Sequence, residues 1–271
     1  MKIDRSDPET RVAEHHRSGT GTTRVGYPIG VRRAAVVGRR EVAPGMVRLT
    51  LGGPELAGFH SYQADDHVKI VFSDADGTRR DPVTNDRQML DWPRPLPRSR
   101  KYTIRRYDAD ALQIELDFVV HPGGLASDWV TSVAVGEHVT VAGPPGALAF
   151  AHNYDHYVFA VDATALPAAA RWLDEAPVDV SAQIVVETDD AGMHEYPLAD
   201  RAGVTVTWLV HDGVRSRLAD TVAELEMPTG RTFLFAAGEA GDITPLRAWA
   251  KERCDDVLVT GYWKRGVAGM D

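Results

Sequence analysis

The spacing of apolar residues changes near the middle of the chain, and this change constrains the fold more than any other feature. From Val31 to about Val141, apolar residues recur at every second position, as in Val47, Leu49 and Leu51. Gly-Pro and Asp-Gly turns interrupt the pattern. Because successive side chains of a strand point to opposite faces, this alternation predicts half-buried antiparallel strands. We therefore expect an N-terminal antiparallel β-barrel.

From Tyr157 onward, short continuous apolar runs alternate with amphipathic segments. Strands that are covered by helices on both faces have such runs, so the pattern predicts a parallel sheet in an α/β domain. The expected strands are Tyr157–Val161, Ala182–Glu187, Val204–Val210, Thr232–Ala236 and Val257–Thr260. The expected helices are Ala165–Glu175, Arg215–Leu225 and Ile243–Cys254.

The two patterns also predict the domain organisation. Residues 1–28 are polar and are expected to form an N-terminal tail, residues 29–150 the β-barrel domain, and residues 151–271 the α/β domain. Residues 79–99 contain four prolines and five arginines, which indicates a long surface loop.

Composition restricts the class of protein. The 271 residues suffice for two domains, and 44% hydrophobic with 25% charged residues is typical of a globular protein. No apolar stretch is long enough for a membrane span, and the N-terminus lacks the basic and apolar regions of a secretory signal. The single cysteine, Cys254, excludes an intrachain disulfide and fits the cytoplasm. We expect a cytoplasmic monomer, and the net charge of −9 argues against nucleic acid as a partner.

The segment Arg100–Arg105, with the sequence Arg-Lys-Tyr-Thr-Ile-Arg, carries the first chemical signal. In a strand, Arg100 and Tyr102 face one side, and Lys101 and Thr103 face the other. An arginine can bind a diphosphate, a tyrosine ring can cover a flavin, and a hydroxyl can reach the flavin N5 edge. The alternative for these six residues is an ordinary amphipathic strand with surface charges.

A second signal lies in the segment from His121 to Trp129, with the sequence His-Pro-Gly-Gly-Leu-Ala-Ser-Asp-Trp. Two glycines allow the backbone to approach a ligand, and Ser127 is a natural N-cap for a helix. The free N–H groups of a helix N-terminus attract anions such as a diphosphate. By itself the segment is a capped helix after a turn, but together with the preceding strand it predicts a flavin site.

Other classes of site lack their patterns. The ten histidines are scattered, and His152 and His156, although four residues apart, have no accompanying zinc-type pattern, so no protein-bound metal is expected. Phosphate-binding Gly-x-x-x-x-Gly-Lys-Ser/Thr, dinucleotide-binding Gly-x-Gly-x-x-Gly and the Gly-x-Ser-x-Gly nucleophile elbow are all missing.

Several motifs, taken together and in order, resemble the siderophore-interacting proteins over roughly residues 30 to 266. Members of this family are FAD-containing ferric-siderophore reductases with the fold of ferredoxin–NADP reductases. The motifs are Asp66-His67-Val68-Lys69-Ile70, Arg100–Arg105, Asp117-Phe118-Val119-Val120-His121, Leu125-Ala126-Ser127-Asp128-Trp129, Gly143-Pro144-Pro145-Gly146, Asp162-Ala163-Thr164-Ala165-Leu166-Pro167, Gly238-Glu239-Ala240 and Gly261-Tyr262-Trp263-Lys264-Arg265-Gly266.

The resemblance implies an FAD-binding barrel, a domain for NADPH or NADH, and a ferric siderophore as substrate. Thr103 is expected to act catalytically at the flavin edge. The expected cofactor-binding residues are Arg100, Tyr102, Thr103, His121, Gly124, Ala126, Ser127, Trp129, Asp162, Thr164, Ala165, Gly238 and Glu239. The residues expected to bind the siderophore are Lys69, Lys264 and Arg265. The alternative for each of them is an ordinary charged residue on the surface. An anionic ferric siderophore needs such a local basic patch on a protein of net charge −9.

The chain departs from the family pattern at the expected nucleotide site. Relatives usually have Gly-Asp-Glu-Thr-Ala-Leu-Pro there, whereas Val161 and Ala163 replace the glycine and the glutamate. A β-branched side chain in place of glycine would narrow the space for the nicotinamide. A ferredoxin is therefore an alternative electron donor.

We expect a ferric-siderophore reductase in which FAD passes electrons from NAD(P)H to iron, because Fe(II) binds hard oxygen donors more weakly than Fe(III) does. Two other interpretations remain. One is a general NAD(P)H flavin reductase or diaphorase, for which iron chelates are incidental acceptors. The other is a non-catalytic protein that binds flavin or siderophore, which Val161 and Ala163 suggest.

Overall fold

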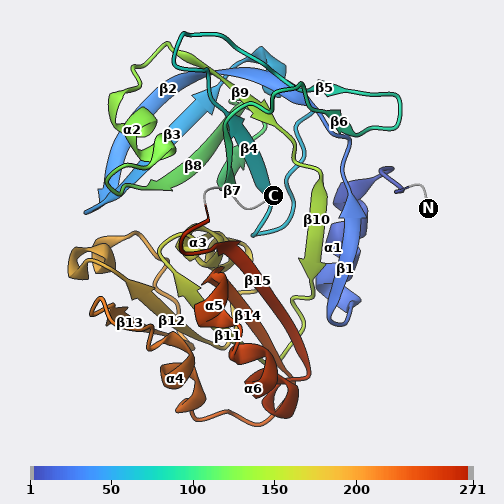
Figure 1. Cartoon of the computed structure of the whole chain (residues 1–271). Helices are drawn as coiled ribbons and strands as arrows, with labels where there is room; N and C mark the ends of the chain where they lie inside the picture. Colours follow the sequence, from blue (N-terminus) through green and yellow to red (C-terminus); the bar gives the residue numbers. More distant parts are fainter. Residues whose placement is uncertain (1–2, 268–271) are drawn as a thin grey trace. The chain divides into compact units, whose positions relative to one another are not determined.

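A computed structural model describes residues 3–267 and contains two compact units (Figure 1). The first unit comprises the residues up to Val12, Arg24–Val42 and Met46–Leu148. The second comprises Ala13–Thr23, Ala43–Gly45 and the residues from Ala149 onward. The predicted fold class, an antiparallel barrel followed by a parallel-sheet α/β domain, is confirmed.

Six antiparallel strands close the barrel of the first unit in the order β2-β3-β8-β7-β4-β9 (Figure 1). Closure pairs both edges of every strand and leaves no open edge. The strands are β2 (Val31–Ala43), β3 (Met46–Gly52), β4 (His67–Val71), β7 (Ser99–Asp108), β8 (Gln113–Val119) and β9 (His138–Ala142).

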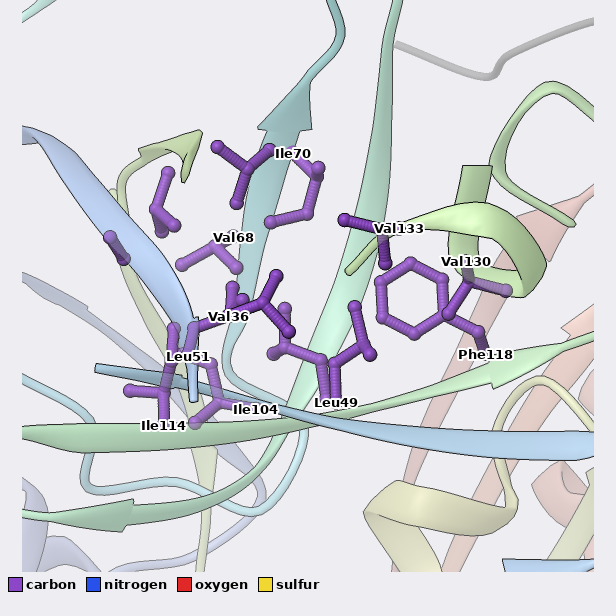
Figure 2. Close-up of a cluster of buried hydrophobic side chains, with 14 of the residues drawn as sticks. Val36, Leu49, Leu51, Val68, Ile70, Ile104, Ile114, Phe118, Val130 and Val133 are labelled. Carbon is purple, nitrogen blue, oxygen red and sulfur yellow. The ribbon is translucent and has the colours of Figure 1, made fainter. Parts of the chain in front are cut away.

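The alternating residues of the sequence fill the barrel interior, as Figure 2 shows. Leu49 and Leu51 of β3 and Val68 of β4 are fully buried. Helix α2 (Leu125–Ser132) contributes Val130 to the same cluster. Burying a side chain of this size is worth about 1.5–3 kcal/mol. The period-two pattern thus corresponds to one shared core.

Residues 79–99, expected as a loop, contain a short hairpin of β5 (Val83–Thr84) and β6 (Leu90–Asp91). The backbone N–H of Asn85 donates to the Met89 carbonyl at 2.9 Å, which closes the turn. No alternation of apolar and polar residues indicates these strands, because each is only two residues long.

The second unit contains a parallel sheet in the order β13-β12-β11-β14-β15 (Figure 1). The strands are β11 (His156–Asp162), β12 (Ala182–Thr188), β13 (Val204–Val210), β14 (Thr232–Glu239) and β15 (Asp256–Trp263). All five expected strands are present. Two of them, β14 and β15, continue three residues further than expected, to Glu239 and Trp263.

Helices cover both faces of this sheet. On one face, Phe159 of β11 packs against Trp172 of α3 (Leu166–Glu175), with ring centroids 4.5 Å apart. On the other face, Val158 and Ala160 share a cluster with α4 (Leu218–Ala223), α5 (Ala240–Ile243) and α6 (Leu246–Arg253). Within residues 3–267, no helix is long and apolar enough to cross a membrane.

Two expected helices differ from the structure. The helix expected at Arg215–Leu225 begins only at Leu218. The helix expected at Ile243–Cys254 is present as α6, but it starts only after Pro245, because the separate helix α5 ends at Ile243. Proline lacks the N–H that a continuous helix needs, so the chain starts a new helix there.

Residues 1–28, expected as a tail, include α1 (Pro8–Ser18) and β1 (Thr22–Gly26), and β1 pairs with β10 (Gly146–Phe150). In the second unit, the His16 ring stacks on His152 with centroids 3.8 Å apart and planes at 9°. The His152 N–H also donates to the His16 carbonyl at 2.7 Å. Burial, with smaller contributions from His16 and His15, lowers the pKa of His152 to about 3.

This histidine stack predicts a pH dependence of stability. The His152 side chain is neutral in the folded protein and has an ordinary pKa of about 6.5 in the unfolded chain. Its contribution to the free energy of unfolding is therefore complete above pH 6.5 and falls as the pH drops toward 3. Between pH 7 and pH 5 we expect it to reduce the free energy of unfolding by about 2 kcal/mol. Denaturant titration should show a shallower pH slope for His152→Phe than for the wild type. Equal slopes would contradict the assignment.

Candidate functional site

An aromatic series joins β7, β8 and α2 in the first unit. The Tyr102 ring lies 3.9 Å from that of Phe118, and the Phe118 ring lies 5.8 Å from that of Trp129. Arg100 precedes Tyr102 by two residues, so the regular pleat gives both the same side of β7. One side of this strand therefore combines a guanidinium group and a half-buried ring that leads toward α2.

The N-terminus of α2 has no side-chain cap. Its N-cap residue is Gly124, and the prediction that Ser127 is the cap is wrong. Ser127 lies inside the first turn, where its hydroxyl donates to the Val119 carbonyl at 3.3 Å and accepts the His121 N–H at 3.0 Å. The hydroxyl thus fixes the loop that leads into the helix. The N–H groups at the start of α2 remain without a side-chain acceptor, as in anion-binding helix termini.

The two glycines before α2 are needed where they stand. Gly123 has φ +71°, a backbone conformation that favours glycine. A Cβ on Gly124 would lie 2.4 Å from the His121 ring. A larger residue at Gly124 would therefore have to move the exposed His121 ring and would crowd the Ser127 hydroxyl, which lies 2.8 Å away.

These features of the first unit fit FAD. A guanidinium group, an uncapped helix terminus and a glycine loop suit a diphosphate, and an aromatic ring suits a flavin. Thr103 is 6% exposed and is the cross-strand partner of His67, on the side of β7 opposite Tyr102. Of the other expected contacts, Ala126 is buried and His121 is exposed.

In the second unit, hydrogen bonds converge on Asp162 at the carboxyl end of β11. Its Oδ1 accepts from the Thr164 N–H at 2.8 Å and the Thr164 hydroxyl at 2.6 Å. Its Oδ2 accepts from the Glu239 N–H at 2.9 Å and the Trp263 indole N–H at 2.7 Å. Burial raises the pKa of Asp162, and these donors oppose the rise. The carboxylate thereby links the ends of β11, β14 and β15.

Glu239 extends this network. Its Oε2 accepts from the N–H groups of Gly241 and Asp242 at 2.5 and 2.9 Å, which caps α5, and its Oε1 accepts from the Arg265 N–H at 3.0 Å. Desolvation would raise the pKa of Glu239, but these donors and the Arg265 charge outweigh it and lower the pKa. The Arg265 guanidinium binds both Asp242 oxygens, at 2.9 and 2.6 Å. Its charge is therefore largely balanced by carboxylates.

The structure also bears on the expected nucleotide site. Both donors of Thr164 are directed to Asp162, and Pro167 in the first turn of α3 has no N–H, so this helix terminus retains few donors for a phosphate. Val161, expected to narrow the space for a nicotinamide, is 0% exposed and belongs to the sheet interior. Its side chain leaves the surface at this edge unchanged.

The expected substrate-binding residues are divided between the units. Lys69 lies in the first unit, where its ammonium group is 5.0 Å from the centre of the Trp92 ring. Lys264 and Arg265 are both exposed residues of the second unit. Within residues 3–267, no group of three or more His, Cys, Asp or Glu side chains is arranged to hold a metal ion.

Sequence reasoning did not single out Trp263, which contacts Asp162, or Trp92, which contacts Lys69. Trp263 lies within the quoted Gly-Tyr-Trp-Lys-Arg-Gly motif, but its bond to Asp162 joins residues 101 positions apart. Trp92 lies in the proline-rich segment at 79–99, which has no periodic pattern to indicate where its ring points.

The barrel part and the α/β part of the chain each match a known protein family. Residues 35–148 match the siderophore-interacting FAD-binding domain, and residues 154–266 match the siderophore-interacting protein family. The chain belongs to the siderophore-interacting protein family. The predicted resemblance is confirmed, and the barrel is the FAD-binding domain of this family.

Individual relatives extend over most of the chain. It is 31% identical over 249 residues to an NADPH-dependent ferric-chelate reductase of Escherichia coli, covering 89% of this chain and 95% of the relative. It is 29% identical to the ferric vibriobactin reductase ViuB of Vibrio cholerae, covering 85% and 88%. A siderophore utilization protein from T. fusca has a similar crystal structure, with TM-score 0.86, 38% identity and coverage of 92% and 98%.

The Asp162 network yields a stability prediction at Gly238. This residue has φ +148°, and a Cβ there would lie 2.6 Å from the Asp162 carboxylate. We expect Gly238→Ala to reduce the free energy of unfolding by about 2 kcal/mol or more, through backbone strain and the clash. Gly213→Ala is the control, because Gly213 also has positive φ, +80°, but faces open space. If chemical denaturation shows the same loss of unfolding free energy for both variants, the clash with Asp162 is excluded as a cause.

Proposed function

We propose that this chain is an FAD-dependent reductase of ferric siderophores that takes electrons from NAD(P)H. The observation that carries the proposal is the face of β7 with Arg100 and Tyr102, next to the uncapped terminus of α2, in a domain of the FAD-binding family. The names of two relatives, a ferric-chelate reductase and a ferric vibriobactin reductase, support iron chelates as substrates.

Each residue of this face has a distinct role in the proposal. Arg100 and the N–H groups of α2 bind the cofactor diphosphate, and Tyr102 covers the flavin ring and excludes water from it. Burial raises the pKa of Tyr102, so its phenol stays protonated and neutral at physiological pH. When bound, FAD accepts two electrons as hydride and transfers them one at a time.

The overall reaction follows from the chemistry of iron. One NAD(P)H reduces two Fe(III) chelates to Fe(II) and releases NAD(P)⁺ and one proton. Fe(II) binds the hard oxygen donors of a siderophore more weakly, so reduction releases the metal. In the first unit, Lys69 attracts an anionic chelate. In the second unit, the exposed Lys264 offers the same charge, while Arg265, already bound to Asp242, contributes less.

The burial of Val161 supports NAD(P)H over ferredoxin, because the reason for doubting a nicotinamide at this edge was the bulk of that side chain. We infer a reducing compartment such as the cytoplasm, because the sequence contains one cysteine, Cys254, and therefore no intrachain disulfide. Burial raises the pKa of this thiol to about 11, so it stays protonated and unreactive. We infer a monomer, in which each chain carries one flavin.

An anaerobic spectral titration tests this function. The purified protein, loaded with FAD, should show the visible bands of oxidised flavin, which should bleach with NADPH or NADH. The bands should return when a ferric chelate is added, with one equivalent of NAD(P)H yielding two of trapped Fe(II). If only reduced ferredoxin bleaches the bands, the electron donor is ferredoxin and not NAD(P)H. A flavin that no donor bleaches, or that ferric chelates leave reduced, would refute the reductase.

The cofactor assignment predicts the behaviour of Arg100→Ala. A hydrogen bond to a charged group is worth about 1.5–3 kcal/mol, so FAD affinity should fall by about 10- to 100-fold. Arg106→Ala is the matched control, since Arg106 lies on the same strand but is exposed and pairs with Asp108. FAD retained per protein after gel filtration, and the dissociation constant for re-added FAD, measure the effect. Equal retention by both variants would contradict a role for Arg100.

A further inference from the structure

A hollow of about 260 Å³ lies in the first unit, on the outer side of β4 and β7. Val68 and Ile70 of β4 point into the barrel core, so the residues between and beside them, Lys69 and His67, face outward. Lys101 of β7 is the cross-strand partner of Lys69. These three side chains form one wall of the hollow, and Leu90 and Trp92 of the β5–β6 hairpin segment form another.

The hollow is cationic. Its lining contains two lysines and no acidic residue, although the chain has a net charge of −9. Burial, and then the charges of Lys101 and Lys69, lower the pKa of His67 to about 4, so both ammonium groups act on the same small space. A concave surface with one sign of charge concentrates ligands of the opposite sign.

The hollow also presents an aromatic surface. The Lys69 ammonium group lies 5.0 Å from the centre of the Trp92 ring, within the range of a cation–π contact, which holds the indole beside the charge. Leu90 adds apolar surface next to it. A ligand that is both planar and anionic can contact the indole and the lysines together.

Size and charge distinguish the two main classes of iron chelate. An apolar cavity of about 150 Å³ accommodates one benzene molecule, so the hollow has room for a single aromatic arm of a chelate. Three catecholates of charge −2 around Fe(III) give a complex of charge −3, built of aromatic rings. Three hydroxamates of charge −1 give a neutral complex in which the chelating groups need no ring.

We propose that this hollow binds one arm of an anionic ferric catecholate, and that Trp92 is a residue that determines specificity for this class over hydroxamates. The inference rests on the proposed reductase function and deepens it. Lys101 lies between Arg100 and Tyr102 in the sequence of β7, so the hollow lies on the side of this strand opposite these two residues, which pair with Ile70 and Val68 of β4.

Binding of redox-inert gallium chelates to the FAD-loaded protein tests the proposal without turnover. Trp92→Leu should weaken binding of gallium(III) tris-catecholate by about 3- to 10-fold, the range expected for an aromatic contact, and change binding of gallium(III) tris-hydroxamate by less than about twofold. Trp92→Phe should restore most of the loss. Lys101→Gln should weaken catecholate binding and reduce its dependence on salt.

Met89→Ala is the matched control, because Met89 is exposed on the same hairpin and does not line the hollow. Loss of affinity in this variant equal to that of Trp92→Leu would indicate a general disturbance of the hairpin and overturn the role of the ring. Equal losses for both chelates, or no loss for Trp92→Leu, would also overturn it.

Turnover separates this inference from the proposed function. If the wild type and Trp92→Leu reduce ferric tris-catecholate with the same KM, the reductase stands and the hollow is not its specificity site. If the flavin-loaded wild type reduces neither chelate, the reductase function fails. In that case a selective effect of Trp92→Leu on gallium tris-catecholate binding would still support the hollow as a binding site.

Discussion

The carboxylate of Asp162 is the interaction on which the carboxyl edge of the parallel sheet depends. It accepts hydrogen bonds from Thr164, from the backbone of Glu239 and from the indole of Trp263, which belong to three separate segments of the chain. Because all these partners donate, they compensate the carboxylate charge, and the charge of Arg265 also acts on it. The same bonds account for the extra length of β14 and β15 beyond the apolar runs, since the last residues of both strands are tied to Asp162. A glycine at 238 is the steric condition for this arrangement.

In the first unit, the alternation of side chains along β7 plays the corresponding role. One side carries Arg100 and Tyr102 next to α2, and the other carries Lys101 next to Lys69. A single strand can therefore serve a planar cofactor and an anionic chelate without bringing the two sets of ligands into competition. A shift of register by one residue would exchange the two sides, so both proposed roles of β7 require its observed pairing with β4 and β8.

The sequence predicts what depends on local periodicity and misses what depends on distant partners. The barrel and the order of sheet strands follow from alternating and continuous apolar runs, which report burial directly. The helix boundary at Pro245 was misjudged because a proline can lie in the first turn of a helix or just before it. The position of Ser127 was misjudged because a serine can cap a helix or lie in its first turn, and its bonds to Val119 and His121 select the second. Val161 was expected to narrow the space for a nicotinamide because a motif position does not reveal which side of a strand the side chain occupies. Trp263 could be found only once its partner Asp162, far away in the sequence, was beside it.

The burial of Cys254 has a practical consequence for physical measurements on this protein. With a pKa of about 11, roughly a hundredfold smaller fraction of this thiol is ionised at neutral pH than of an ordinary cysteine. Thiol-reactive dyes attack the ionised form, so the half-buried Cys254 competes weakly for them. A single cysteine introduced at an exposed position, such as Val83 on the hairpin, can then carry a fluorophore without first removing the natural one. The chain is in this respect already prepared for site-specific labelling.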